Sequence, residues 1–272
     1  MNRAPSHESG TWHYGLVARW WAEFNVAEPH QLEYWREAIK KFGEPAIDLG
    51  CGTGRFLVPL RREGLDIDGS DVSEDMLAEV RTSAAGIDSP PALFAQALHE
   101  MELPRRYRSM FICGAFGLGG SRERDREALR RAHLHLEPGG ALLMMQTLPN
   151  NERQSPESWA EWLPGHRAAL PEPWPETGNR RRCADGDELE LISRTVAFDS
   201  IEQLEVLEMR ARLWHEAAMV REEDYSLRAC LYFPQELVLM LEDAGFREVT
   251  IEGNYTGALA RQDEGEVIFV AR

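Results

Sequence analysis

The sequence predicts an α/β protein built on a doubly wound, mostly parallel sheet, and three observations support this. Between residues 45 and 147, short apolar runs alternate with amphipathic stretches, as strands alternate with crossover helices. Three glycines stand within positions 50–54, directly behind the first apolar run. An acid, Asp71, ends the next apolar run 21 residues beyond Gly50, a spacing typical of nucleoside-binding sheets.

The expected elements of this sheet follow in chain order. Apolar runs predict strands, and amphipathic stretches with capping residues predict helices between them. Pro234 and Gly245 delimit a further helix before the chain ends in two more strands, which makes seven. The predicted strands are 45–49, 65–70, 92–96, 109–113, 140–147, 247–252 and 266–271, and the predicted helices are 54–63, 73–84, 122–136 and 234–244.

An antiparallel β insertion is expected after the fifth strand. Residues 149–183 are rich in prolines and tryptophans. Alternation of apolar and polar residues over 187–198 and 204–215 predicts strands with one solvent-exposed face. A connection of this length is far longer than usual and is typical of a binding lid. We therefore expect three parts: a helical, aromatic N-terminal segment (1–44), a Rossmann-like ligand-binding domain (45–148 with 233–272) and an inserted lid or substrate region (149–232).

Composition excludes several functional classes. The 272 residues carry a formal net charge of −16, which would repel polyphosphate, so we expect no nucleic-acid partner. The start MNRAPSHESG has no apolar core of a signal peptide, and no apolar stretch approaches the roughly 20 residues of a membrane span, so a cytoplasmic protein without membrane contact is expected. Four dispersed cysteines predict neither disulfides nor a metal site. The oligomeric state is left open.

The glycine loop predicts a nucleoside ligand. Gly50, Gly52 and Gly54 form a turn between strand and helix whose backbone amides can face a ligand, and the Asp71 carboxylate can accept both hydroxyls of a ribose. The dinucleotide fingerprint would need its third glycine at position 55, where Arg55 stands. A pyrophosphate ligand is therefore disfavoured.

The motif DLGCGTG at 48–54 resembles the first motif of class I S-adenosylmethionine-dependent methyltransferases. The resemblance continues through 69–77, 94–104 and 136–144, and the tail with its AGF turn is also similar to this family. It implies a seven-stranded Rossmann-like methyltransferase fold, S-adenosylmethionine as cofactor, S-adenosylhomocysteine as product, no metal, and a small-molecule acceptor.

The resemblance also implies roles for individual residues. The glycine loop would lie under the methionine moiety, Val72 and Met76 would border the adenine, and the segment after Cys113 would receive the methionine ammonium. Where the family often has an acid for the adenine amino group, this chain has Gln96, so that side chain and the backbone of its two successors are the candidates. The implied cofactor residues are Tyr14, Asp48, Gly50, Cys51, Gly52, Gly54, Asp71, Val72, Met76, Gln96, Ala97, Leu98, Cys113, Gly114 and Phe116.

The acceptor side is less determined. Methyl transfer needs a nitrogen or oxygen lone pair in line with the sulfur–methyl bond, and proximity and desolvation can supply most of the rate. No catalytic residue is assigned; Tyr14, His166 and His215 are candidates, with imidazole a suitable base near neutral pH. Tyr14 could lie over the cofactor, as in related enzymes. Arg19 could pair with the methionine carboxylate or with a surface acid.

The function expected is methyl transfer to a small molecule, in a pocket closed by the N-terminal segment and the insertion. A protein-directed methyltransferase is an alternative, which an open cleft would favour. A protein that binds S-adenosylmethionine without catalysis and regulates a partner is another. A nicotinamide dehydrogenase is the third.

Overall fold

The computed structural model describes residues 11, 13–148, 169–261 and 264–272. The chain divides into two compact units. The insert unit comprises Met1–Asn25, Gly117–Ser121 and Ser155–Leu231. The main unit comprises Val26–Phe116, Arg122–Gln154 and Tyr232–Arg272.

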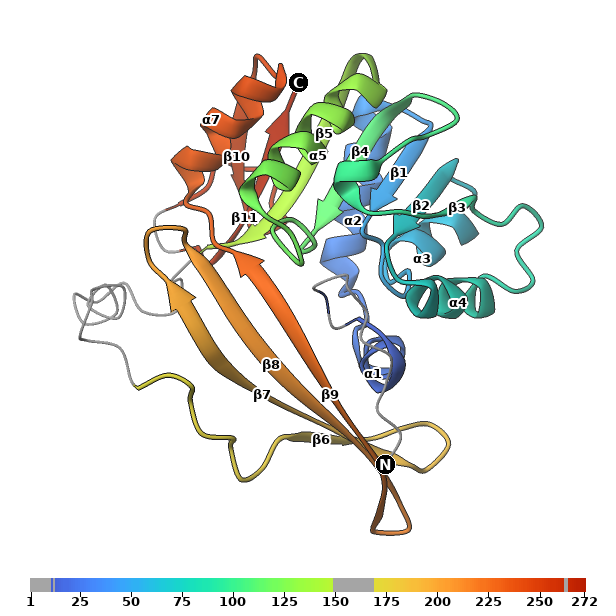
Figure 1. Ribbon diagram of the computed structural model, residues 1–272. Coiled ribbons are helices and arrows are strands. Elements are labelled where there is room, and N and C mark those ends of the chain that lie inside the picture. The colour runs from blue at the N-terminus through green and yellow to red at the C-terminus, as the bar shows by residue number, and fades with distance from the viewer. Residues whose placement is uncertain (1–10, 12, 149–168, 262–263) are drawn as a thin grey trace. The chain divides into compact units, whose positions relative to one another are not determined.

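The main unit contains a seven-stranded sheet in the order β10-β11-β5-β4-β1-β2-β3 (Figure 1). All neighbouring pairs are parallel except those of β11, which is antiparallel to both β5 and β10. The predicted doubly wound, mostly parallel sheet is thereby confirmed. Its strands are β1 (Ala46–Leu49), β2 (Ile67–Asp71), β3 (Leu93–Ala95), β4 (Tyr107–Cys113), β5 (Leu136–Thr147), β10 (Val249–Gly253) and β11 (Glu266–Ala271).

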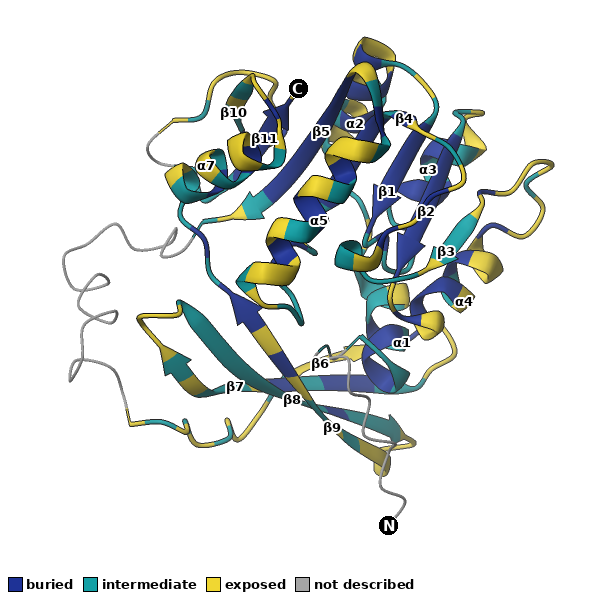
Figure 2. Cartoon of the chain, turned by 45° about the horizontal axis from the view of Figure 1, so that its top comes forward, coloured by how far each residue is buried: buried dark blue, intermediate teal, exposed yellow. Residues whose placement is uncertain are grey.

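Helices cover both faces of this sheet, with α5 in front of it and α2 behind it in Figure 1. Alternate residues of β4 therefore bury in different cores: Phe111 stacks on Trp35 of α2 with ring centroids 4.7 Å apart, while Met110 is equally buried. Strands covered on both faces appear as continuous apolar runs, dark blue in Figure 2, which is why they were predictable. The helices are α2 (Pro29–Phe42), α3 (Leu57–Arg62), α4 (Glu74–Ser83), α5 (Arg122–His135) and α7 (Pro234–Ala244), with a 3₁₀ turn at Leu98–Glu100.

The insert unit contains a second, antiparallel sheet in the order β6-β7-β8-β9. Helix α1 (Gly15–Phe24) packs on it by burying Leu16, Val17 and Trp20 against Leu189 and Ala211. The predicted antiparallel insertion is thereby confirmed. The strands are β6 (Asn179–Arg182), β7 (Glu188–Asp199), β8 (Leu204–His215) and β9 (Ala218–Cys230).

The observed elements differ from the predicted ones in three places. The fifth strand, expected over 140–147, begins at Leu136 in β5, where a register shift against β4 and the positive φ of Gly139 (79°) accommodate the extra residues. Strands β6 and β9 were not predicted. All of β6 and most of β9 are exposed, so neither shows an apolar pattern.

Contacts distribute residues 1–44 over both units. Helix α1 belongs to the insert unit and α2 to the main unit. Arg19 pairs with Asp185 at 2.7 Å and with Asp187 at 3.2 Å, so its partners are surface acids. Among the described residues, no helix is long and apolar enough to span a membrane.

Candidate functional site

The glycine loop and Asp71 meet at one edge of the main sheet. Strands β1 and β2 are parallel neighbours, so their carboxyl ends lie together. The amides of Gly50 and Cys51 both donate to the Ser70 carbonyl, at 2.7 and 2.8 Å. The amide of Gly52 then donates to Asp71 Oδ2 at 2.9 Å. The loop is therefore tied to the acid that the sequence places 21 residues beyond Gly50.

All three loop glycines have a positive φ, but the space around them differs. A Cβ on Gly50 would lie 2.4 Å from the Ala115 Cβ, and one on Gly54 would lie 2.9 Å from Val58 Cγ2. A Cβ on Gly52 would meet no atom within 4 Å. Packing within the protein thus requires two of the glycines, and the third borders open space beside Asp71. This open cradle fits a ligand that approaches the backbone closely.

Asp71 is a buried carboxylate held by backbone amides. Burial raises its pKa, and the hydrogen bonds from Ser73, Gly52 and Val72 oppose that rise. Ser73 donates to Oδ1 at 2.8 Å and Gly52 to Oδ2 at 2.9 Å, so the backbone holds both carboxylate oxygens. Each carboxylate oxygen has a second lone pair. Asp71 therefore retains acceptor capacity toward a ribose.

The residues implied for the adenine follow directly from β2 and β3. Val72 is an exposed apolar side chain, at 42% relative exposure, next to the buried Asp71. The Gln96 amide donates to the Asp71 carbonyl at 3.0 Å, and its side-chain Oε1 accepts from the Glu102 amide at 3.0 Å. Its Nε2 is buried and has no partner among the described residues. A donor left unpaired here suits a ring nitrogen of adenine, an acceptor. Met76 is buried on α4, Ala97 directly precedes the 3₁₀ turn, and Leu98 begins it.

The residues implied for the methionine end gather around the carboxyl ends of β1 and β4. Asp48 is 2% exposed, and its Oδ1 has no partner among the described residues. Burial raises its pKa to about 7, the Arg55 guanidinium opposes that rise, and Asp71 adds to it. An unpaired carboxylate oxygen fits an ammonium group. Cys113 ends β4, Gly114 follows with a φ of 70°, and Phe116 packs on Tyr232.

The thiols near this site are inert. Burial raises the pKa of Cys51 and of Cys113 well above the usual value, so both stay protonated at neutral pH. Within the described residues no group of acids, histidines and cysteines could hold a metal ion.

Asp48→Asn is expected to stabilise the ligand-free protein at pH 8. The folded-state pKa of about 7 lies above the ordinary value of 3.8 for an aspartate. Asp48 therefore does not lower the free energy of unfolding below about pH 3.8, and it lowers that free energy progressively as the pH rises to 7. The difference of about three pH units between the two pKa values corresponds to at most about 4 kcal/mol above pH 7. Melting temperatures between pH 4 and 8 measure this gain, which should shrink toward low pH.

The exposed Asp88 provides a matched control for this substitution. Asp88→Asn makes the same chemical change at the surface, where no burial cost is relieved, and should leave the melting temperature close to wild type throughout. Equal melting temperatures for Asp48→Asn and wild type at pH 8 would contradict a cost of ionising the buried Asp48.

The acceptor-side candidates lie in the insert unit or outside the described residues. Tyr14 directly precedes α1, and its carbonyl accepts from the amides of Val17 and Ala18. His215 ends β8 at the surface and contacts Asp187 through Nδ1 at 2.8 Å. His166 lies outside the described residues. Their roles toward an acceptor remain predictions.

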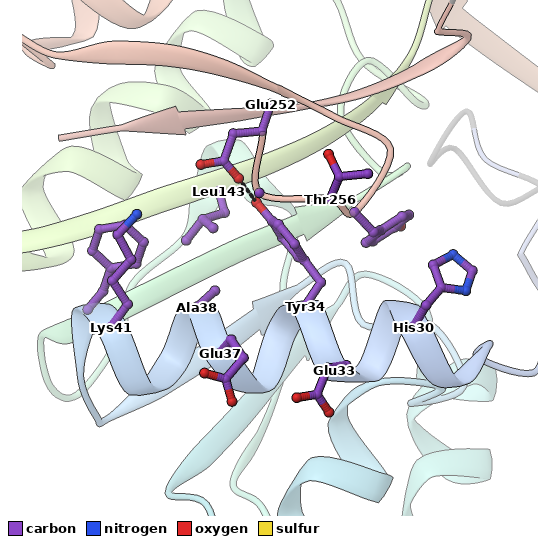
Figure 3. A pocket seen from close by; sticks show the side chains of 12 residues that line it. His30, Glu33, Tyr34, Glu37, Ala38, Lys41, Leu143, Glu252 and Thr256 are labelled. Atoms are coloured by element: carbon purple, nitrogen blue, oxygen red, sulfur yellow. Dashed lines mark hydrogen bonds between the residues drawn. The ribbon is translucent and has the colours of Figure 1, made fainter. Parts of the chain in front are cut away.

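One feature of the main unit was missed by sequence reasoning. A cavity of about 360 Å³ runs along α2 toward the residues that follow β10 (Figure 3). Tyr34 points across it and donates to Glu252 at 2.7 Å. Tyr255 also lines this cavity and packs on Tyr34 and Trp35. No local motif marks Tyr255, which stands about 200 residues beyond the glycine loop and comes to the same edge of the sheet only through the strand order.

Comparisons with known proteins agree with this geometry. Residues 46–140 match the model of a family described as a methyltransferase domain. A protein of Geobacillus sp. (strain WCH70) whose name proposes a methyltransferase is 30% identical over 95 residues, which are 33% of this chain and 38% of that protein. This chain therefore matches little more than a third of that relative's length.

Similar solved structures cover nearly the whole chain. An S-adenosylmethionine-dependent methyltransferase from Clostridium acetobutylicum ATCC 824 has a TM-score of 0.69 at 13% identity, covering 94% of this chain and 96% of that one. A sugar N-methyltransferase from Streptoalloteichus sp. ATCC 53650 has a TM-score of 0.66 at 16% identity, covering 100% and 99%. At these identities the likeness concerns the fold. Residues 46–140 thus match a methyltransferase domain, in a chain with the Rossmann-like methyltransferase fold.

Proposed function

We propose that this protein transfers the methyl group of S-adenosylmethionine to a nitrogen or oxygen of a small molecule and releases S-adenosylhomocysteine. The observation that carries the proposal is the open space at Gly52 beside the Asp71 carboxylate. Two of the buried polar atoms without a partner among the described residues, Asp48 Oδ1 and Gln96 Nε2, support it because they match the ammonium and adenine ends of that cofactor.

The chain's residues would act by holding the two reactants. Asp71 accepts from the ribose hydroxyls, Gln96 donates to the adenine, and Asp48 accepts from the ammonium group. The cofactor, when bound, supplies an electrophilic methyl on a sulfonium. Transfer then requires an acceptor lone pair in line with the sulfur–methyl bond, and positioning alone contributes up to about 7–11 kcal/mol in well-oriented systems.

A small amine-bearing acceptor is the preferred substrate class. The fold likeness to a sugar N-methyltransferase, which extends over both units, supports it. We assign the acceptor region to the antiparallel insertion with the N-terminal segment, and Tyr14, His166 and His215 stay its candidate residues. The charge of −16 supports an acceptor that is not nucleic acid.

Two measurements test the proposal in order. Calorimetry should show binding of S-adenosylhomocysteine and no binding of NAD⁺. The protein is then incubated with S-adenosylmethionine and one acceptor class at a time: amino sugars, amines, phenols, carboxylic acids or peptides. One class should raise the rate of S-adenosylhomocysteine release above the rate measured without an acceptor. Release with peptides alone would favour a protein-directed enzyme. Binding without any release would favour the regulatory alternative, and NAD⁺ binding alone would overturn the proposal.

A further inference from the structure

The main unit contains a buried hydroxyl whose partner is missing. Tyr255 is 6% exposed, and its hydroxyl has no hydrogen-bond partner among the residues that the structure describes. Leaving such a group unpaired costs free energy, so its presence calls for an explanation such as a ligand. The nearby Tyr34 has the ordinary arrangement, because its hydroxyl donates to Glu252.

The backbone at Tyr255 is also unusual. Its φ is 57°, a left-handed conformation that bulky residues rarely adopt. The other non-glycine residues with positive φ in the described chain lie in the hairpin turns after β7 and β8. Tyr255 is held there by a turn in which the Thr256 amide donates to the Gly253 carbonyl at 2.9 Å. Strained residues held this firmly are concentrated at functional sites.

Sheet topology brings Tyr255 to the edge that carries the glycine loop. Strand β10 is antiparallel to β11, which is antiparallel to β5, so β10 runs in the same direction as β5, β4 and β1. Tyr255 follows the carboxyl end of β10 by two residues. The groups that act on Tyr255 agree with this placement. Burial raises the pKa of Tyr255, and the nearby Cys113, Glu266 and Asp48 raise that pKa further, whereas Arg55 lowers it.

The chemistry of the site leaves one requirement open. The amino-acid end of the cofactor carries an ammonium, for which Asp48 is the acceptor, and a carboxylate, which needs donors. Arg19 pairs with two acids of the insert unit. Burial raises the pKa of Tyr255, so it stays protonated at neutral pH and can only serve a carboxylate as a donor. Arg55 acts electrostatically on both Asp48 and Tyr255 and lies over the Phe56 ring at 4.3 Å.

We propose that the Tyr255 hydroxyl, together with the Arg55 guanidinium, binds the carboxylate of S-adenosylmethionine. This assignment rests on the proposed function. It makes Tyr255 a cofactor-binding residue, contributed by the turn after the edge strand β10, that helps to fix where the methyl group points.

The test compares two ligands that differ in the amino-acid end. S-adenosylhomocysteine carries the carboxylate, and 5′-methylthioadenosine lacks it. Tyr255→Phe should weaken binding of S-adenosylhomocysteine about ten- to hundredfold, as expected for a hydrogen bond to a charged group, and leave 5′-methylthioadenosine within about twofold. Arg55→Gln should show the same selectivity. Because Tyr255→Phe removes only an unpaired hydroxyl, its melting temperature should not fall.

Tyr34→Phe is the matched control, since it removes a hydroxyl from the same aromatic cluster whose partner is Glu252. It should leave the ratio of the two affinities unchanged. If wild type binds both ligands and Tyr255→Phe changes neither, or changes both equally, the assignment of Tyr255 is overturned and the proposed function stands. If wild type binds neither ligand, the proposed function itself fails.

Discussion

Asp71→Ala is expected to weaken binding of S-adenosylhomocysteine at least about a hundredfold. The substitution removes the acceptor for two ribose hydroxyls, and each hydrogen bond to a charged group contributes roughly 1.5–3 kcal/mol. It also leaves the amides of Gly52 and Ser73 without the oxygen that each now contacts at 2.9 and 2.8 Å. The glycine loop thereby loses its tie to β2.

Calorimetry on the folded variant measures this loss, with thermal unfolding as a check that the protein remains native. A ligand control separates the loss of the ribose contact from the loss of the tie between the glycine loop and β2. An S-adenosylhomocysteine analogue without ribose hydroxyls should bind wild type weakly and lose much less affinity on Asp71→Ala. Unchanged affinity for S-adenosylhomocysteine itself would overturn the assignment of Asp71 to the ribose.

Gly52→Val should abolish cofactor binding while the protein still folds. No protein atom lies within 4 Å of the position that a Cβ would take there, so the side chain extends into the space assigned to the ligand. The φ of 54° at this position disfavours a branched residue, at a cost of roughly 1–3 kcal/mol of stability. The expected result is a modest fall in melting temperature with no detectable binding.

Alanine at two of the loop glycines sharpens this experiment. Gly50→Ala places a Cβ 2.4 Å from Ala115 and should lower the melting temperature more than Gly52→Ala, which meets no atom. Gly52→Ala should in turn weaken binding out of proportion to its effect on stability. Normal cofactor affinity in a folded Gly52→Val variant would show that the loop does not border the ligand.

Much of the fold was predictable because its determinants are local. The central strands β1, β4 and β5 are buried along most of their length, so their sequences are apolar runs, and helix α4 carries its own cap, Ser73, which accepts from the Met76 amide. Strands β6 and β9 escaped prediction since exposed strands need no apolar pattern. The early start of β5 at Leu136 also escaped prediction, because a register shift depends on the pairing with β4 and not on the local sequence.

The candidate site likewise contains residues that the local sequence predicts and properties that it does not. The sequence by itself determined the glycine loop, Asp71 and Gln96, because short motifs and fixed spacing along consecutive strands encode them. Only the tertiary structure decided that Gly52, alone among the three loop glycines, borders open space and that Asp48 is buried with a raised pKa. It also paired Arg19 with surface acids and brought Tyr255 to the carboxyl edge of the sheet. These properties depend on atoms from segments distant in the chain, whose proximity arises from strand order and packing rather than from any local pattern.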